Sequence, residues 1–142
     1  MKALTICQPY ASLIIGWPGM PEEERKPVEN RTWHCHYRGP LLIHAGKSKK
    51  YLDTWDGPVP EEMLFGVILG QVRMVGCRTP LRLDYPLRMS IHVEGPFCFV
   101  LRDPQRFDLP IPFRGQKGMF DVPADAMKGM LAGVMTGAVQ RD

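Results

Sequence analysis

The 142-residue sequence contains no apolar run that approaches the length of a membrane-spanning helix, roughly 18 residues. Its four cysteines form no C-x-x-C pair, and the chain has no internal repeat and no low-complexity tract. The N-terminus lacks the apolar segment followed by small residues that marks a secretory signal. These absences exclude a helical membrane protein and predict one cytoplasmic domain, spanning residues 1–142, with reduced thiols.

Charge of either sign is also modest. The net charge is +3 at pH 7, which permits an anionic partner without requiring one. The chain has 14 prolines and 14 glycines, and residues of these two types interrupt long helices. This composition disfavours a helical bundle and favours short strands joined by turns. We therefore predict an α+β domain built around a curved sheet.

Cysteine and histidine provide a weak case for a metal site. The cysteines are Cys7, Cys35, Cys77 and Cys98. Each lies in a strand-like segment, where cysteine usually behaves as a small buried hydrophobe. His34 and His36 would share one face of a strand, but no third ligand is close in the sequence. We expect structural cysteines and neither a metal nor a cofactor.

Hydrophobic patterning predicts the order of the elements. Strands are expected over residues 2–7, 28–36, 41–45, 65–77, 97–101 and 118–122, with helices over 9–15 and 123–138. Residues 103–115 carry three prolines and are expected to be a loop. The continuous apolar run at 41–45 predicts a strand covered on both faces, in which His44 is a core residue.

The strand expected over residues 28–36 is polar on both sides, which is typical of a sheet edge or of a strand that lines a wet cleft. Glu29, Arg31 and Trp33 would share one face. The Arg31 guanidinium can bind a phosphate or a base edge, and Glu29 can accept a hydrogen bond from an exocyclic amine. The alternative is a simple Glu29–Arg31 ion pair, with Trp33 in the core.

Basic and aromatic residues elsewhere fit the same chemistry. Lys26 can supply a charge for phosphate, and Tyr10, Trp17 or Trp33 can stack on an unpaired base. A positive rim could be extended by Lys47, Lys49, Lys50, Arg114 and Lys117.

Several of these segments, in their order along the chain, resemble the ASCH domains, which are relatives of the PUA fold. The resemblance rests on residues 4–13, 26–33, 37–45, 95–101 and 110–115. Residues 26–33 (KPVENRTW) match the family core G-x-K-x-x-E-x-R at its lysine, glutamate and arginine, whereas Glu24 stands at the glycine position. The resemblance, of the bacterial and phage type, implies a small mixed β-barrel with helices packed around it. It also implies a cleft between the first helix and the strand that carries the motif.

The resemblance also implies what the cleft does. Members of the family are mostly linked to RNA or DNA binding, and some small bacterial members deacetylate N4-acetylcytidine nucleosides. In those hydrolases the motif lysine helps to activate a threonine, assisted by a later glutamate. The lysine corresponds to Lys26, but Glu29 stands at the threonine position. Glu94 is a candidate for the later glutamate.

The sequence therefore predicts a domain that binds RNA, another single-stranded nucleic acid or a nucleoside. The expected ligand-binding residues are Gln8, Tyr10, Lys26, Glu29, Arg31, Trp33 and Lys47. One alternative is a metal-independent amidohydrolase that acts on an acylated cytidine, with Lys26 and Glu29 as an acid–base pair. A ribonuclease, using a histidine with Lys26, is the less favoured enzyme. The second alternative is a protein-interaction module carried by the helix at 123–138.

Overall fold

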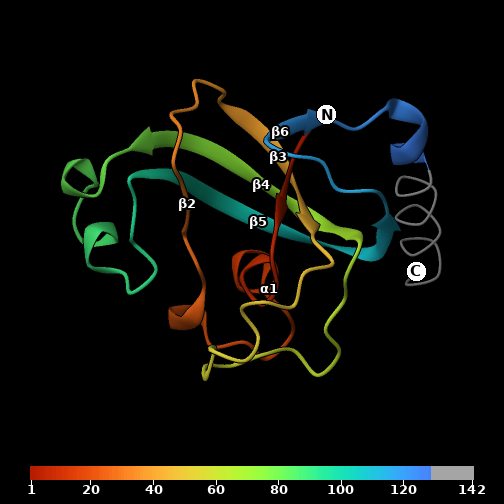
Figure 1. Ribbon diagram of the computed structural model, residues 1–142, viewed down its shortest axis with the longest axis horizontal. Helices are drawn as coiled ribbons and strands as arrows, with labels where there is room; N and C mark the ends of the chain where they lie inside the picture. The colour runs from red at the N-terminus through yellow and green to blue at the C-terminus, as the bar shows by residue number, and fades with distance from the viewer. Residues whose placement is uncertain (129–142) are drawn as a thin grey trace, which may run out of the picture.

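Six strands form one mixed sheet in the computed structural model, which describes residues 1–128. The strands are β1 (Lys2–Ile6), β2 (Val28–Arg31), β3 (Gly39–Ala45), β4 (Val67–Arg78), β5 (Phe97–Pro112) and β6 (Met119–Asp121). The helix α1 spans Tyr10–Ile15, and single 3-10 turns lie at Glu22–Glu24, Pro80–Arg82 and Leu87–Met89. The sheet has the order β2-β5-β4-β3-β1-β6 and curves into a half-barrel (Figure 1). Strands β1 and β3 are parallel, and the other neighbouring pairs are antiparallel.

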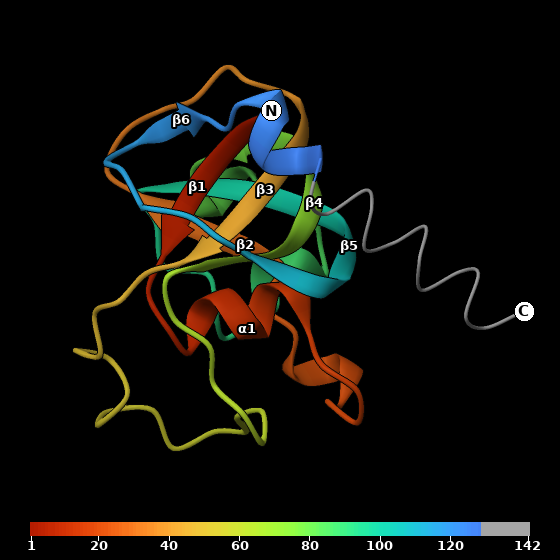
Figure 2. The same cartoon turned by 90° about the vertical axis from the view of Figure 1, so that its right-hand side faces the viewer.

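The centre of the sheet is buried on both faces, as the apolar run at 41–45 predicts. Leu41 and Ile43 of β3 belong to a core cluster that includes Ile14 of α1. Leu42 points to the opposite face and packs in a second cluster with Phe120 of β6. Figure 2 shows α1 lying against one side of the curved sheet.

Helix α1 is short, and its C-terminal end is held by a side chain from outside it. It begins at Tyr10, directly after Pro9, and ends at Ile15. Gly16 follows with a φ of 87°, a conformation that favours glycine. The Arg25 guanidinium donates to the carbonyl oxygens of Ile14 and Ile15, at 3.1 and 2.8 Å. These two carbonyls are among those that a helix end leaves without partners, so Arg25 stabilises the end of the helix.

The expectation of a loop over residues 103–115 is wrong, because strand β5 continues as far as Pro112. Strand β2 pairs with residues 97–100 of β5, and within residues 1–128 no strand pairs with the rest of that edge. Proline is tolerated there because its missing N–H interrupts no hydrogen-bond ladder. Register shifts between β4 and β5 accompany the long strand. At Gly70 the backbones come so close that a Cβ would collide with the Gln105 backbone oxygen.

The strand expected over residues 28–36 is too long. Strand β2 ends at Arg31, and the chain then turns so that Trp33 packs edge-on against Phe99, with ring centroids 5.1 Å apart. Phe99 is the β5 partner of Glu29, so Trp33 packs on the side of the sheet that carries Glu29, although it lies beyond the end of the strand. The strand stops because β5 begins at Phe97, the partner of Arg31, and offers no further residue to pair with.

At the C-terminal end, residues 124–128 are helical and Met127 packs in the second core cluster. They agree with the start of the helix expected over 123–138, the remainder of which lies outside the described residues, as does most of the proposed interaction module. All four cysteines are free; Cys35, Cys77 and Cys98 are buried, as expected, and Cys7 is half-buried. Within residues 1–128 there is no helix of the length and apolar character needed to cross a membrane.

Candidate functional site

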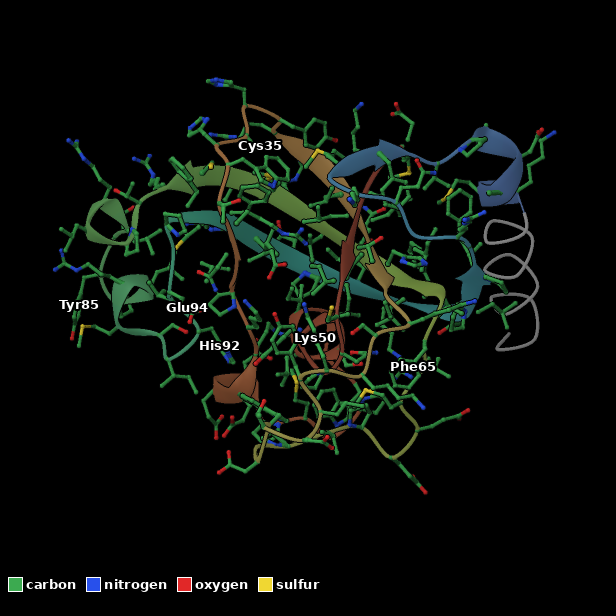
Figure 3. The ribbon with its side chains drawn as sticks, in the orientation of Figure 1. Cys35, Lys50, Phe65, Tyr85, His92 and Glu94 are labelled. Carbon is green, nitrogen blue, oxygen red and sulfur yellow. The ribbon has the colours of Figure 1, made fainter. Side chains whose placement is uncertain are left out.

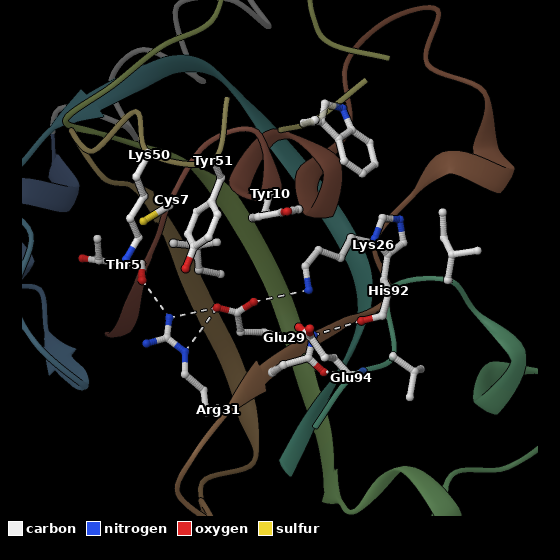
Figure 4. Close-up of a pocket in the computed structure, with 15 residues that line it drawn as sticks. Thr5, Cys7, Tyr10, Lys26, Glu29, Arg31, Lys50, Tyr51, His92 and Glu94 are labelled. Carbon is white, nitrogen blue, oxygen red and sulfur yellow. Dashed lines mark hydrogen bonds and ion pairs between the residues drawn. The ribbon is translucent and has the colours of Figure 1, made fainter. Parts of the chain in front are cut away.

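The candidate site lies at the seam where the half-barrel comes closest to closing. Strand β2 is at one end of the sheet and β1 is next to the other end. Strand β6 pairs with residues 2–4 of β1, so Thr5 lies beyond its reach. The Arg31 Nη2 atom donates to the Thr5 backbone oxygen at 2.8 Å (Figure 4). Within residues 1–128 no backbone ladder joins β2 to β1, and a side chain of β2 links the two strands instead.

Three charged residues form a continuous row across this seam. The Lys26 Nζ atom lies 3.4 Å from Glu29 Oε1 and donates to the Val28 carbonyl oxygen at 2.6 Å. Arg31 approaches the other carboxylate oxygen of Glu29, with Nη2 at 2.9 Å and Nε at 3.2 Å. Exposed fractions of 4% for Lys26 and 9% for Glu29 place the row at the bottom of the site. The Glu29 carboxylate is therefore fixed between two cations.

Burial determines the electrostatics of the row. Desolvation lowers the pKa of Lys26, and the charge of Glu29 opposes that shift. Desolvation also raises the pKa of Tyr10, with further contributions from Tyr51, Glu94 and Glu29. Removing one partner from a buried ion pair leaves an uncompensated charge, so Lys26 and Glu29 hold each other in place.

Aromatic rings lie over the row of charged residues, which forms the polar floor of the site. Tyr10 of α1 lies 5.5 Å from Tyr51 and 6.0 Å from Trp55, measured between ring centroids. The Trp55 ring stacks on His92 at 6.0 Å, with 27° between the ring planes. The Lys26 Nζ atom lies 5.6 Å from the Tyr10 ring centroid, which links the rings to the charged row.

The floor and the rings enclose a cleft of about 680 Å³, which we call the seam cleft. Lys50, which lines this cleft, is exposed and lies over the Tyr51 ring at 4.9 Å. Figure 3 labels Lys50, His92 and Glu94, which reach the same cleft from two different loops.

Asn30 holds the loop that brings His92 and Glu94 to the seam cleft. Its Nδ2 donates to the His92 carbonyl oxygen at 2.9 Å. Its Oδ1 accepts from the backbone N–H groups of Glu94 and Gly95, at 3.0 and 2.8 Å. One side chain of β2 therefore positions a loop that is distant in the sequence.

The structure brings together four of the seven residues expected to bind a ligand: Tyr10, Lys26, Glu29 and Arg31. The other three lie elsewhere. Gln8 is fully buried and bonds the Ser12 N–H and the Leu64 carbonyl oxygen, which makes it a structural residue. Trp33 packs on Phe99, and Lys47 lines a second cleft.

The sequence reasoning missed Tyr51, Trp55 and His92. All three lie in segments for which the periodicity indicates no regular strand, and such segments give no sign of which way a side chain points. The available signal was composition, because Tyr51 and Trp55 follow a lysine-rich stretch, a combination typical of surfaces that bind single-stranded nucleic acid. Glu94, singled out by the resemblance, does line the cleft.

A metal centre finds no support in residues 1–128. No group of three or more His, Cys, Asp or Glu side chains in this part of the chain is arranged to hold an ion. His34 and His36 are exposed and lie against each other, with ring centroids 4.5 Å apart.

Comparisons with known proteins agree with the fold. No family model matches the sequence. The chain is 25% identical to activating signal cointegrator 1 of Homo sapiens over 147 residues and to that of Mus musculus over 146 residues. These matches cover 93% of the chain, which spans 24% of the length of each of these relatives.

Two of the similar solved structures are crystal structures of ASCH from Zymomonas mobilis and of a mutant of that protein, each with a TM-score of 0.54. They are 12% and 13% identical to this chain and cover 92% of it, with 93% and 96% of their own chains matched. The resemblance inferred from the sequence motifs is therefore confirmed, and the chain has the fold of an ASCH domain.

Proposed function

We propose that the seam cleft binds one unpaired base of a single-stranded nucleic acid, with RNA as the preferred ligand. The observation that carries this proposal is the buried Glu29 carboxylate, held between Lys26 and Arg31 beneath a group of aromatic rings. Similarity to ASCH domains, whose PUA-like fold is associated with RNA binding, supports it. RNA is recognised mostly at unpaired bases, which stack on aromatic side chains and expose their hydrogen-bonding edges.

The polar floor offers one acceptor and one donor side by side. A carboxylate has about four acceptor positions, and the bonds from Lys26 and Arg31 leave some of those on Glu29 for a ligand. The bonds of Arg31 to Glu29 and Thr5 come from its Nε and Nη2 atoms, so Nη1 is the donor for a ligand. This arrangement fits a base edge with an amino group beside an acceptor, such as that of cytosine.

The aromatic rings supply affinity that does not depend on sequence. Tyr10, Tyr51 and Trp55 surround the position above the floor, and His92 extends this group of rings. Stacking of a base on such rings contributes about 1–3 kcal/mol per base. Rings that already pack on one another lose little conformational freedom when a base inserts.

Lys26 and Lys50 take different roles in this proposal. The sequence predicts that Lys26 binds phosphate. In the structure its Nζ atom contacts the Val28 carbonyl oxygen and the Glu29 carboxylate, and the residue is only 4% exposed. Lys26 instead holds the Glu29 carboxylate in position. The exposed Lys50 at the rim is the better partner for a phosphate.

The experiment is an anisotropy titration of fluorescently labelled single-stranded RNA, single-stranded DNA and a duplex at two salt concentrations. We expect single strands to bind more tightly than the duplex. Glu29→Gln should change the base preference, because the amide presents a donor where the carboxylate only accepts. Lys50→Ala should weaken binding to every sequence and reduce the salt slope by about 0.7.

Lys49→Ala is the matched control, because Lys49 is the neighbouring exposed lysine and lies over Phe65 rather than in the cleft. It should leave affinity close to that of the wild type. Duplex binding as tight as single-strand binding, or an unchanged base preference in Glu29→Gln, would overturn the proposal.

Hydrolysis of an acylated cytidine is the second candidate, and one observation favours it. Lys26, Glu29 and Glu94 line the same cleft, and burial lowers the pKa of Lys26. In this reaction water would add to the amide, releasing acetate and the free amine of cytidine. Release of acetate from N4-acetylcytidine that disappears in Glu94→Gln would support it, and no release by the wild type would reject it.

A further inference from the structure

A second cleft, of about 920 Å³, lies on the other side of Thr5. It is formed by the turn that follows β3, the glycine that precedes β4, and the segment that joins β5 to β6. We call it the basic cleft because its lining includes Lys47, Arg114 and Lys117 but, within residues 1–128, no aspartate or glutamate. All three cations are exposed, so the cleft presents positive charge that no lining carboxylate offsets.

The floor of the basic cleft is polar and fixed. His44 lies in it, with Nε2 2.6 Å from the Phe113 carbonyl oxygen and Nδ1 3.1 Å from Thr5 Oγ1. Because a carbonyl oxygen only accepts, Nε2 carries the proton and donates to it. Burial lowers the pKa of His44, aided by the nearby Lys47 charge, so the neutral ring uses Nδ1 to accept from the Thr5 hydroxyl.

Gly115 lets the chain pack directly on this floor. A Cβ at this position would lie 2.9 Å from both His44 Cε1 and Thr5 Oγ1. The close approach holds residues 112–117 against the floor, with Arg114 and Lys117 on either side of the glycine. Arg114 and Lys117, two of the three cations of the basic cleft, are therefore carried by a segment with a defined position.

The two clefts meet at one residue. The Thr5 backbone oxygen is bound by Arg31 in the seam cleft, while its side chain lines the basic cleft. Lys47 and Lys50 lie on the same loop, one in each cleft. A positive path thus leads from the proposed base site into the basic cleft.

We propose that the basic cleft binds the phosphodiester backbone of the nucleotides adjacent to the base held in the seam cleft. The inference rests on the proposed function of the seam cleft, and it adds a sequence-independent subsite. Cations that face no carboxylate suit phosphate, and the polar floor carries no base-reading pair comparable with Glu29 and Arg31. The ligand is therefore a chain of several nucleotides rather than a free nucleoside.

The test compares cytidine monophosphate with a labelled 12-nucleotide single-stranded RNA, using the double variant Lys47→Glu/Lys117→Glu. We expect the affinity for the long RNA to fall about tenfold or more and the salt slope to decrease by about 1.4, as two phosphate contacts are lost. Affinity for cytidine monophosphate should stay within about twofold, because the base site is intact. Both substituted residues are exposed, and the milder pair Lys47→Gln/Lys117→Gln serves if charge reversal disturbs folding.

The matched control is Arg73→Glu/Arg102→Glu, which changes the net charge by the same amount on the exposed surface of β4 and β5. Equal loss of RNA affinity in this control would overturn the inference, since the effect would come from the overall charge. Equal loss for cytidine monophosphate would also overturn it. If Glu29→Gln leaves base preference unchanged while the basic-cleft variant still loses RNA affinity, the base site fails and the backbone subsite stands.

Discussion

The seam cleft and the basic cleft differ in how their cations are partnered. In the seam cleft, Lys26 and Arg31 are committed to the buried carboxylate of Glu29. In the basic cleft, no ion pair within residues 1–128 joins Lys47, Arg114 or Lys117 to a carboxylate. Buried and mutually paired charges fix geometry, which suits recognition of a base edge. Exposed cations attract any phosphate chain, so they add affinity without selecting a sequence.

The strongest test of this contrast is the stability of Glu29→Ala. The substitution leaves Lys26 buried without its carboxylate and removes a partner of Arg31. We expect the free energy of unfolding to fall by about 3–5 kcal/mol, measured by urea denaturation. Lys26→Ala should cost less, because Glu29 keeps its bonds to Arg31.

In the basic cleft, Lys47→Ala should change the unfolding free energy by no more than about 0.5 kcal/mol, because it removes an exposed cation. A similar loss of stability in Glu29→Ala and Lys47→Ala would break the distinction between the two clefts.

Stacking separates the clefts in a second way. Trp55→Ala removes a ring from the seam cleft and should weaken RNA binding by about 1–3 kcal/mol, with the salt slope unchanged because no charge is lost. Anisotropy at several salt concentrations measures both quantities. Trp17→Ala is the control, since Trp17 lines neither the seam cleft nor the basic cleft. An effect of equal size in the control would count against a stacking role.

Gly115→Ala tests the packing of the basic cleft. The added methyl group would press on His44 and Thr5, and overpacking of this kind costs about 1–3 kcal/mol. We expect a lower urea midpoint and weaker binding of the 12-nucleotide RNA, with cytidine monophosphate affinity retained. Unchanged stability would show that the segment can move away from the floor. Gly118→Ala is a weaker comparison, because Gly118 has a positive φ but no atom near its Cβ position.

The smallest expected effect is the pH dependence of stability. Burial lowers the pKa of His44 in the basic cleft and of His92 in the seam cleft from the ordinary histidine value of 6.5. Below that value the unfolded chain binds more protons than the folded one, so the free energy of unfolding falls as the pH decreases. Urea denaturation between pH 7 and pH 5 measures it, and His92→Gln should remove part of the decrease. An unfolding free energy that rises as the pH decreases would contradict the lowered pKa values of His44 and His92.

The fold was largely predictable because the apolar pattern is unambiguous at the sheet centre. The run at 41–45 indicates a strand covered on both faces, and packing on both sides of β3 confirms it. The continuation of β5 through its prolines was not predictable, because it depends on how far β2 extends along the neighbouring edge. Local propensity carries no information about that distance.

The candidate site was predictable where its residues lie close together in the sequence. Lys26, Glu29 and Arg31 fall on one short segment, so their spacing alone brings them together. Trp55 and His92 meet across loops that pattern analysis leaves undefined. Gln8, which was expected to bind a ligand, instead bonds backbone groups on α1 and at Leu64. Only tertiary contacts distinguish these outcomes.

The bond from Arg31 to the Thr5 oxygen has a consequence for how this chain can vary. A sheet closed by backbone hydrogen bonds leaves its side chains free to change, because closure does not depend on residue type. Here closure uses the side chain that also faces the proposed ligand. A substitution that alters specificity at Arg31 therefore also loosens the seam, and new specificities should arise first in the loops that carry Tyr51 and His92.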